Sequence, residues 1–451
     1  MPAANTKTNS AGLKALYTKE DSWATWIGFA AIAFALILWA AGSDMRTILV
    51  PFSPYDNFNE IPAMVAPLLP NIVLLYLLLM LVFGTAMNIM GHDVKAFTKG
   101  FSLLFVIAFV VQVLGAWSVS VQLSFETPLI ALIVGMVIGN FIRIPDWFDA
   151  AMRTEFYVKT GIVLMGATLP FSLILQSGPL AIGQALCISI VTFAVIYVMA
   201  AHVFKLEKPF AATLGVGGSV CGISASIAIA SSVNAKKSHV SMALSMVVIW
   251  AIVMAFLLPI ACRALGLASG VAGAWIGSSE FADAAGMVAA AQFGEDALTT
   301  FTLVKVLGRD IFIGFWAFAL AIISVTVWEA KKGNGEGVQQ KPSATVMWDR
   351  FPKFVLGFLA ASIIISIVSL GLGSASAPPL DSAVIQPIKG LRDWAFTLCF
   401  LCIGMTTRFK DLASMGWKPF VAFSVGVLVN FALGFFLSAV LFADYWAAVG
   451  L

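Results

Sequence analysis

A glycine-rich stretch, 214-LGVGGSVCGISASIAIASSV-233, carries small hydrogen-bonding side chains at close spacing. They alternate with glycines, which permit an unwound backbone: Gly215, Gly217, Gly218 and Gly222. An interrupted helix leaves N–H groups without partners at its new N-terminus, and such an end suits an oxyanion. Hydroxyl groups add donors without fixed charge. We therefore expect a substrate site made by Ser219, Cys221, Gly222, Ser224 and Ser226. The alternative is that the small residues only allow helices to approach closely.

A second set of candidate residues is charged. Glu280 and Asp283 stand three residues apart, and Lys305 and Arg309 stand four apart, so each pair shares a helical face. These side chains either form structural ion pairs or act on a ligand. In the second case Lys305 is a counter-charge to a bound anion and Arg309 is a bidentate donor, although Asp310 competes for Arg309. Glu280 and Asp283 are candidates for a protonatable coupling group.

The surroundings of these residues are strongly apolar. Hydrophobic residues make up 60% of the 451 and charged residues only 11%, whereas a soluble domain has roughly 25% charged residues. The net charge of +3 gives no indication of nucleic-acid binding, and no metal-ligand, phosphate-loop or dinucleotide spacing appears. Cys399 and Cys402 fall inside an apolar segment, where packing is favoured over redox chemistry because a reactive thiol must be accessible. We expect an all-α polytopic membrane protein without a cofactor or metal.

Apolar runs of about 20 residues, the length that spans a bilayer, recur along the chain. They lie near 22–41, 68–90, 101–121, 127–143, 155–176, 179–203, 209–232, 239–262, 270–293, 299–328, 353–372, 385–407 and 417–442. This pattern predicts roughly 11–13 transmembrane helices. Segments 209–232 and 270–293 contain glycines and small polar residues, so both are expected to be broken helices. Unwound backbone at membrane depth survives only inside protein or beside a wet cavity.

The polar segments predict the order of the chain's parts. These are a cytoplasmic N-terminal tail (1–21), helices that include both broken segments (22–328), a polar cytoplasmic linker (329–352) and C-terminal helices (353–451). The polar start is unlike a cleavable signal peptide. Lysine and arginine gather in alternate loops, which predicts a cytoplasmic N-terminus and an external C-terminus. Lys236 and Lys237 break this pattern, so either 209–232 does not cross simply or these lysines have a function.

An internal similarity favours inverted repeats. The stretches 163–186 and 401–424 share a helix that ends near a glycine, a short connection, a proline and a new apolar run. The helix count gives them opposite directions, as in transporters built from inverted repeats. The two broken segments also align, Ala225 with Ala285, but the same count gives both one direction. A miscounted span would explain this conflict.

Four stretches resemble a known family: 219-SVCGISASIAIASSV-233, 238-SHVSMALSMVVIWAIVMAFLLP-259, 278-SSEFADAAGMVAAA-291 and 302-TLVKVLGRD-310. They are similar to the YeiH-type family of sulfate exporters, which implies a multi-pass protein of a bacterial inner membrane. A more distant similarity is to the superfamily of bile-acid:sodium symporters and sodium/proton antiporters. It implies a panel domain, a core domain with two crossing broken helices and elevator-like alternating access. The chain departs from the antiporters because 219–232 has no carboxylate.

Together these features predict a carrier that exports a small oxyanion, sulfate or a related anion, by alternating access. At an inside-negative potential of about 100 mV, each exported negative charge gains about 2.3 kcal/mol, so export needs no coupling ion. The runner-up is a sodium- or proton-coupled organic-anion carrier that uses Glu280 or Asp283. An enzyme or a sensor is the third alternative, but the sequence shows no catalytic dyad, set of metal ligands or soluble domain that would indicate one. The expected partners are the anion and the lipid bilayer, with a homodimer expected only by analogy.

Overall fold

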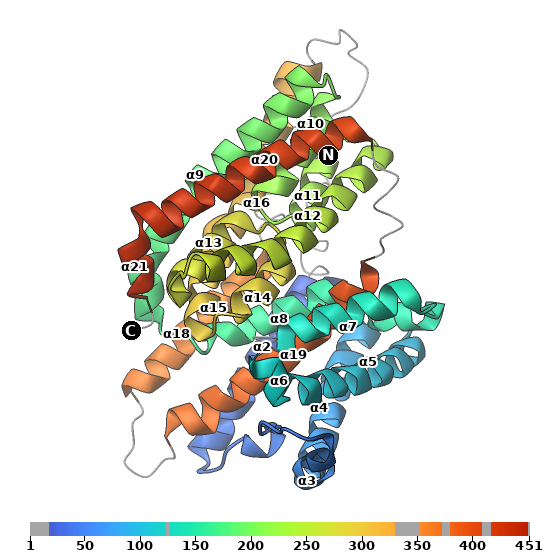
Figure 1. Cartoon of the computed structure of the whole chain (residues 1–451), viewed down its shortest axis with the longest axis vertical. Coiled ribbons are helices and arrows are strands. Elements are labelled where there is room, and N and C mark those ends of the chain that lie inside the picture. The colour runs from blue at the N-terminus through green and yellow to red at the C-terminus, as the bar shows by residue number, and fades with distance from the viewer. Residues whose placement is uncertain (1–17, 123–126, 330–351, 372–378, 408–415, 450–451) are drawn as a thin grey trace, which may run out of the picture. The chain divides into compact units, whose positions relative to one another are not determined.

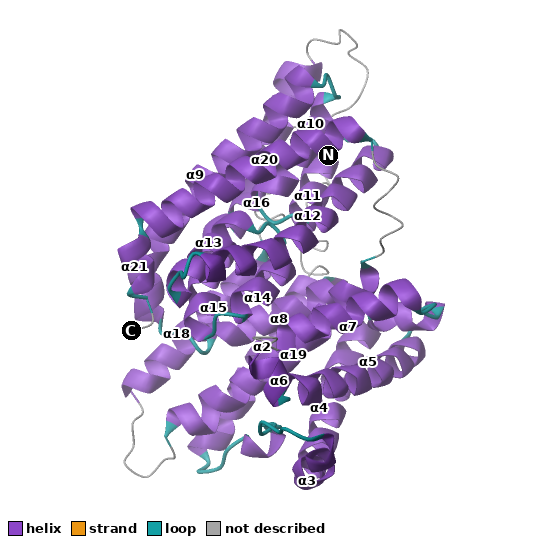
Figure 2. Cartoon of the chain, in the orientation of Figure 1, coloured by secondary structure: helices purple, strands orange, loops and turns teal. Residues whose placement is uncertain are grey.

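The structure, a computed structural model, describes residues 18–122, 127–329, 352–371, 379–407 and 416–449. These ranges are built from helices, and no strand occurs within them (Figure 2). Among the described residues, eight helices are long and apolar enough to cross a membrane. This confirms the prediction of an all-α polytopic membrane protein. The other five of the thirteen apolar segments form helices that are shorter or carry more charge.

The described chain divides into two compact units. Unit 1 contains residues 1–172 and 353–407, and unit 2 contains residues 173–352 and 408–451. The predicted tail and the predicted linker 329–352 lie almost entirely outside the described residues. The same is true of the connection in the second of the two similar stretches, 401–424, so the inverted repeat stays a prediction.

Unit 1 is a helical bundle (Figure 1). Its elements are α2 (Glu20–Ala40), η1 (Arg46–Ile48), η2 (Phe58–Glu60), α3 (Ile61–Val65), η3 (Ala66–Leu68), α4 (Leu69–Ile89), α5 (Val94–Gly115), α6 (Ser118–Gln122), α7 (Thr127–Phe141), η4 (Asp146–Ala151), α8 (Thr154–Gly166), α18 (Lys353–Gly371), η9 (Asp381–Ile385) and α19 (Gln386–Thr406). Helix α8 is buried from Phe156 to Gly166. Gly135 and Gly139 let α7 approach α19 closely, because a methyl group on either would lie within 2.4 Å of an α19 carbonyl oxygen.

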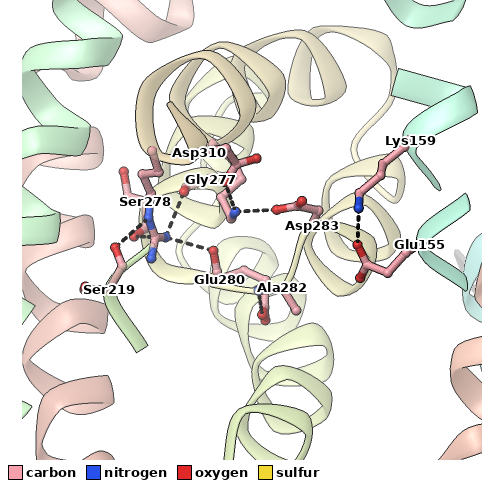
Figure 3. A network of polar contacts seen from close by, with 11 residues as sticks. Glu155, Lys159, Ser219, Gly277, Ser278, Glu280, Ala282, Asp283 and Asp310 are labelled. Atoms are coloured by element: carbon pink, nitrogen blue, oxygen red, sulfur yellow. Dashed lines mark hydrogen bonds and ion pairs between the residues drawn. The ribbon is translucent and has the colours of Figure 1, made fainter. Parts of the chain in front are cut away.

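Charged side chains join the first residues of α2 and α8 in unit 1. The Lys159 ammonium lies 3.1 Å from an oxygen of Glu155 (Figure 3). It also lies 2.6 Å from an oxygen of Asp21. Arg153 lies 3.3 Å from Glu20. These pairs allow a nearly buried lysine in the first half of α8 to keep its charge.

Unit 2 holds both predicted broken segments. Its elements are α9 (Phe171–Val198, from Leu173 on), η5 (Met199–Val203), α10 (Lys208–Ser219), α11 (Ile223–Ser232), α12 (Lys237–Ala264), α13 (Ser269–Ser279), α14 (Asp283–Ala291), α15 (Glu295–Thr302), η6 (Leu303–Asp310), α16 (Phe312–Ile323), η7 (Ser324–Glu329), α20 (Trp417–Phe435), η11 (Phe436–Leu441) and α21 (Ala443–Ala447). Each broken segment forms two short helices (Figure 1).

The first broken segment, α10–α11, is a hairpin that returns to the end from which it enters. Glu207, just before α10, pairs with Lys236, just after α11. The rings of Phe210 and His239 stack at the same end, with centroids 4.5 Å apart. The 12 residues of α10 rise about 18 Å, roughly half of a 30 Å hydrocarbon layer. Each arm of the segment is therefore too short to cross such a layer, and the chain turns back.

The second broken segment, α13–α14, is also a hairpin. Ser269 at the start of α13 donates through Oγ to the carbonyl oxygen of Phe293, 2.5 Å away and just beyond α14. Arg263, near the end of α12, donates to the side chain of Gln292 at 3.2 Å. The end of α12, the start of α13 and the end of α14 thus lie together.

The two hairpins enter unit 2 from opposite ends of α12. This helix has 28 residues, a length of about 42 Å, with α10–α11 attached at its start and α13–α14 at its end. The prediction of crossing broken helices was therefore wrong in form. The count that gave both segments one direction was also wrong, because it treated each as a full crossing. With 209–232 returning, Lys236 and Lys237 lie at the same end as Lys208, which resolves the exception to the charge pattern.

Candidate substrate site at the hairpin tips

The tips of the two hairpins meet at Gly222 and Phe281. A methyl group on Gly222 would lie 3.3 Å from the carbonyl oxygen of Phe281 and 2.8 Å from Val247 on α12. Gly222 has φ +64°, a conformation that favours glycine, and its N–H donates to the Gly217 carbonyl oxygen at 3.1 Å. Both the turn and the close contact explain why glycine stands here.

Arg309, on the π-helical stretch η6, binds the carbonyl groups that the two interruptions release. Its Nη1 donates to the carbonyl oxygens of Gly277 at 3.2 Å, Ser278 at 2.8 Å and Glu280 at 2.8 Å (Figure 3). Its Nε donates to the Ser219 carbonyl oxygen at 3.3 Å. A cation at the C-termini of α10 and α13 also complements their dipoles. Arg309 therefore holds the two tips together, and only Nη2 is left without a partner.

The other predicted charges gather at the second tip. Lys305 is fully buried and pairs with Asp283 and with Asp310, the latter at 2.6 Å (Figure 3). Glu280 accepts a hydrogen bond from the N–H of Ala282 at 2.9 Å. We call Glu280, Asp283, Lys305, Arg309 and Asp310 the tip cluster. Of the alternatives left open by the sequence, the structure shows Lys305 in ion pairs with two carboxylates.

The N-terminus of α11 differs from that of α14. Residues Glu280 and Asp283 bring negative charge to the start of α14. At the start of α11 the N-cap is Gly222, which has no side chain to accept a bond. The N–H groups of the first turn, Ile223 to Ala225, have no acceptor within the helix. The positive end of the α11 dipole therefore faces the tip without a protein anion at its cap.

Several fully buried polar atoms around the tips have no hydrogen-bond partner. Within the described residues, they are Ser219 Oγ, Ser226 Oγ, Ser279 Oγ, Glu280 Oε2, Arg309 Nη2, Asp310 Oδ2 and both amide atoms of Asn430. Buried polar groups in proteins are nearly always bonded, so a concentration of unbonded ones points to a bound solute or water. The set contains both donors and acceptors.

The structure places the predicted residues unequally around this site. Ser219 and Ser226 lie at the tip with unpaired hydroxyls, and Ser224 belongs to the first turn of α11. Cys221 packs in an apolar cluster with Val220 and others. Ser279 and Asn430 were not among the predicted site residues, and a single amide in an apolar run more often links helices than binds a ligand. An isolated amide in an apolar helix was the available signal for Asn430.

In the described ranges, no group of three or more His, Cys, Asp or Glu side chains could hold a metal ion.

Comparison with known proteins gives the family. Residues 99–423 match a family model described as "Conserved hypothetical protein 698". The chain belongs to this family. The matched range includes both hairpins and the whole tip cluster.

Relatives in this family are named UPF0324 membrane proteins and come from bacteria. One from Nitratidesulfovibrio vulgaris is 33% identical over 379 residues, covering 82% of this chain and 64% of the relative. One from Rhodopirellula baltica is 33% identical over 378 residues (82% and 68%), and one from Nitrosomonas europaea is 30% identical over 370 residues (72% and 74%). The chain thus spans slightly less than two thirds of the first relative. The YeiH-type resemblance agrees with this family, whereas the similarity to the symporter and antiporter superfamily stays a prediction. No solved structure matches the chain.

Proposed function

We propose that this protein is a secondary transporter that binds a small oxyanion, sulfate or a related anion, at the hairpin tips and exports it by alternating access. One observation carries the proposal: two half-length hairpins enter unit 2 from opposite ends of α12 and meet tip to tip among unpaired buried donors. Unpaired backbone at membrane depth is a feature of carrier sites. The protein is then a carrier rather than an enzyme, in a bacterial inner membrane with its N-terminus in the cytoplasm. The homodimer stays a prediction.

The donors at the first tip have the chemistry to bind an anion. The hydroxyls of Ser219 and Ser226 and the Nη2 of Arg309 have no hydrogen-bond partner, and the first N–H groups of α11 have no acceptor within the helix. Lys305 contributes less to anion binding than the sequence predicted, because two carboxylates already neutralise its charge. Arg309 has a double role, holding four carbonyl groups while keeping one nitrogen open. A site of mostly uncharged donors also allows the anion to leave.

Removing the unpaired hydroxyls provides the test. In Ser219→Ala and Ser226→Ala, no hydrogen bond within the protein is lost, so we expect the thermal stability of the free protein to stay the same. If each hydroxyl donates to a bound anion, each variant should lower anion affinity at least about 10-fold, because a hydrogen bond to a charged group contributes about 1.5–3 kcal/mol. The measurements are thermal unfolding of the purified protein and efflux of labelled sulfate from proteoliposomes.

Ser189→Ala is the matched control. Ser189 is also a fully buried serine of unit 2, but its Oγ accepts a hydrogen bond from the indole N–H of Trp316 at 3.0 Å. This variant should lose stability without losing anion affinity. If Ser219→Ala and Ser226→Ala behave like Ser189→Ala, or leave affinity unchanged, the tip is not the anion site.

The tip cluster gives a specific reason to keep a coupled organic-anion carrier as the second candidate. Three carboxylates, Glu280, Asp283 and Asp310, face two cations, and oxygens of Glu280 and Asp310 are unpaired. Ionised in full, the cluster carries one net negative charge, which a proton or a sodium ion would neutralise. We expect Glu280→Gln to abolish any dependence of flux on a proton or sodium gradient in the same proteoliposomes. If flux through the unmodified protein is independent of both gradients, the coupled carrier is excluded and uncoupled export remains.

A further inference from the structure

Asn430 is the most unusual polar residue in the described part of α20. It is fully buried, and neither its Nδ2 nor its Oδ1 has a hydrogen-bond partner. A side-chain amide carries two N–H donors and a carbonyl acceptor. Leaving both kinds unpaired in an apolar interior costs several kcal/mol, and polar groups kept at membrane depth usually serve a function.

The position of Asn430 on α20 directs it to the second hairpin tip. Phe423, Asn430 and Gly434 stand seven and four residues apart, which places them on one helical face. The ring of Phe423 meets the ring of Phe281 edge to face, with centroids 5.5 Å apart. Gly434 lies against Ser279, since a methyl group there would be 2.3 Å from Ser279 Oγ. Asn430 therefore lies between two residues that contact either side of Glu280.

Unpaired donors and acceptors both occur around this position. In a guanidinium group, Nε and Nη2 share one edge, and the Nε of Arg309 already points to the Ser219 carbonyl oxygen. The open Nη2 therefore lies on the side of the first tip. The unpaired acceptors are Oε2 of Glu280, Oδ2 of Asp310 and Oδ1 of Asn430. A fully deprotonated anion such as sulfate can accept from the donors but gives nothing to these acceptors.

We propose that Asn430 is a substrate-binding residue and that the substrate is a protic oxyanion, a small anion that keeps at least one O–H group. Hydrogencarbonate and 2-hydroxycarboxylates are members of this class. The charged oxygens of the anion accept from Arg309 Nη2, the tip serines and Asn430 Nδ2. Its O–H donates to Asn430 Oδ1 or to an unpaired carboxylate oxygen. This inference rests on the proposed function and, among the oxyanions that it covers, favours anions with an O–H group over sulfate.

The test compares ligands on the purified full-length protein. Ligands that bind the native state raise its unfolding temperature, so sodium hydrogencarbonate, glycolate, acetate and sulfate are titrated at matched pH and ionic strength. We expect hydrogencarbonate or glycolate to stabilise the protein at concentrations at least 10-fold lower than acetate or sulfate. Glycolate and acetate form the sharpest pair, because they differ by one hydroxyl group. Sulfate that stabilises at concentrations as low as the protic anions overturns the substrate class.

Asn430→Leu tests the residue itself. Leucine has a similar volume and no hydrogen-bonding group, so the free protein should unfold at the same or a higher temperature, because two unpaired buried polar groups are removed. Affinity for the protic anion should fall at least 10-fold, whereas affinity for sulfate or acetate should change less. Asn430→Ala gives a second reading if leucine disturbs packing. Gln112→Leu is the control: its Nε2 donates to Thr397 Oγ1 at 3.2 Å in unit 1, so stability should fall and affinity should not.

The outcomes separate this inference from the proposed function. If no anion stabilises the unmodified protein, the proposed function fails and this inference fails with it. If anions bind but Asn430→Leu and Asn430→Ala bind them as well as the unmodified protein, only the assignment of Asn430 is overturned.

Discussion

Arg309→Met is expected to destabilise unit 2 by a large share of its total stability. The guanidinium donates to four backbone carbonyl oxygens, those of Ser219, Gly277, Ser278 and Glu280. A buried acceptor left without a donor costs about 1–3 kcal/mol, so the total loss is on the order of 4 kcal/mol or more. That is a large share of the roughly 5–15 kcal/mol by which proteins are stable. Size-exclusion chromatography in detergent should show loss of the monodisperse species, and thermal unfolding should show a large fall in midpoint.

Two variants calibrate this prediction. Arg309→Lys keeps the charge, but one ammonium group cannot reach both hairpin tips in the way a planar guanidinium does, so it should recover only part of the stability. Arg263→Met removes an exposed arginine of the same unit that donates to the side chain of Gln292, and should cost less than about 1 kcal/mol. An unchanged unfolding midpoint in Arg309→Met would show that the tips do not depend on this side chain.

Gly222→Ala should displace the two tips from each other and abolish anion flux. Two costs add together. At φ +64° and ψ −113° an L-residue lies in a sparsely populated backbone region, which costs about 1–3 kcal/mol, and the new methyl group would meet Val247 at 2.8 Å and the Phe281 carbonyl oxygen at 3.3 Å. Overpacking of this kind costs about 1–3 kcal/mol. We expect the free energy of unfolding to fall by about 3 kcal/mol, together with loss of efflux from proteoliposomes.

Gly266→Ala measures the cost of a positive φ without a steric clash. Gly266 has φ +61°, nearly the value at Gly222, but no atom lies within 4 Å of a methyl group placed there. This variant should show only the backbone cost and retain flux. A loss in Gly222→Ala no larger than that in Gly266→Ala would mean that the close packing around Gly222 contributes nothing.

Some of the contacts around the hairpin tips could be predicted from the sequence, and others could not. The spacing of Lys305 and Arg309 predicted that both would face one region, and they do, together with Glu280 and Asp283. It left open whether Lys305 forms ion pairs or binds an anion, and it did not predict that Arg309 would bind carbonyl groups or that Asp310 would pair with Lys305. Backbone carbonyl groups lack helical partners only where the helices are interrupted, and residue types do not predict which carbonyl groups these will be. Asn430 was not predicted as a site residue for the same reason. Whether its side-chain amide has hydrogen-bond partners depends on residues that are distant in the sequence.

The sequence by itself determined that the helices lie in a lipid bilayer and where two of the helical segments are interrupted. Sixty per cent hydrophobic residues in long runs require helices in a bilayer, and a glycine such as Gly222 permits a turn that other residues resist. The direction taken after the turn was decided by tertiary structure. Residues 207 and 236 pair across 29 positions, and Ser269 bonds to Phe293, which brings the ends of each segment together. A broken helix that continues and one that returns have the same composition, and only contacts between distant residues distinguish them.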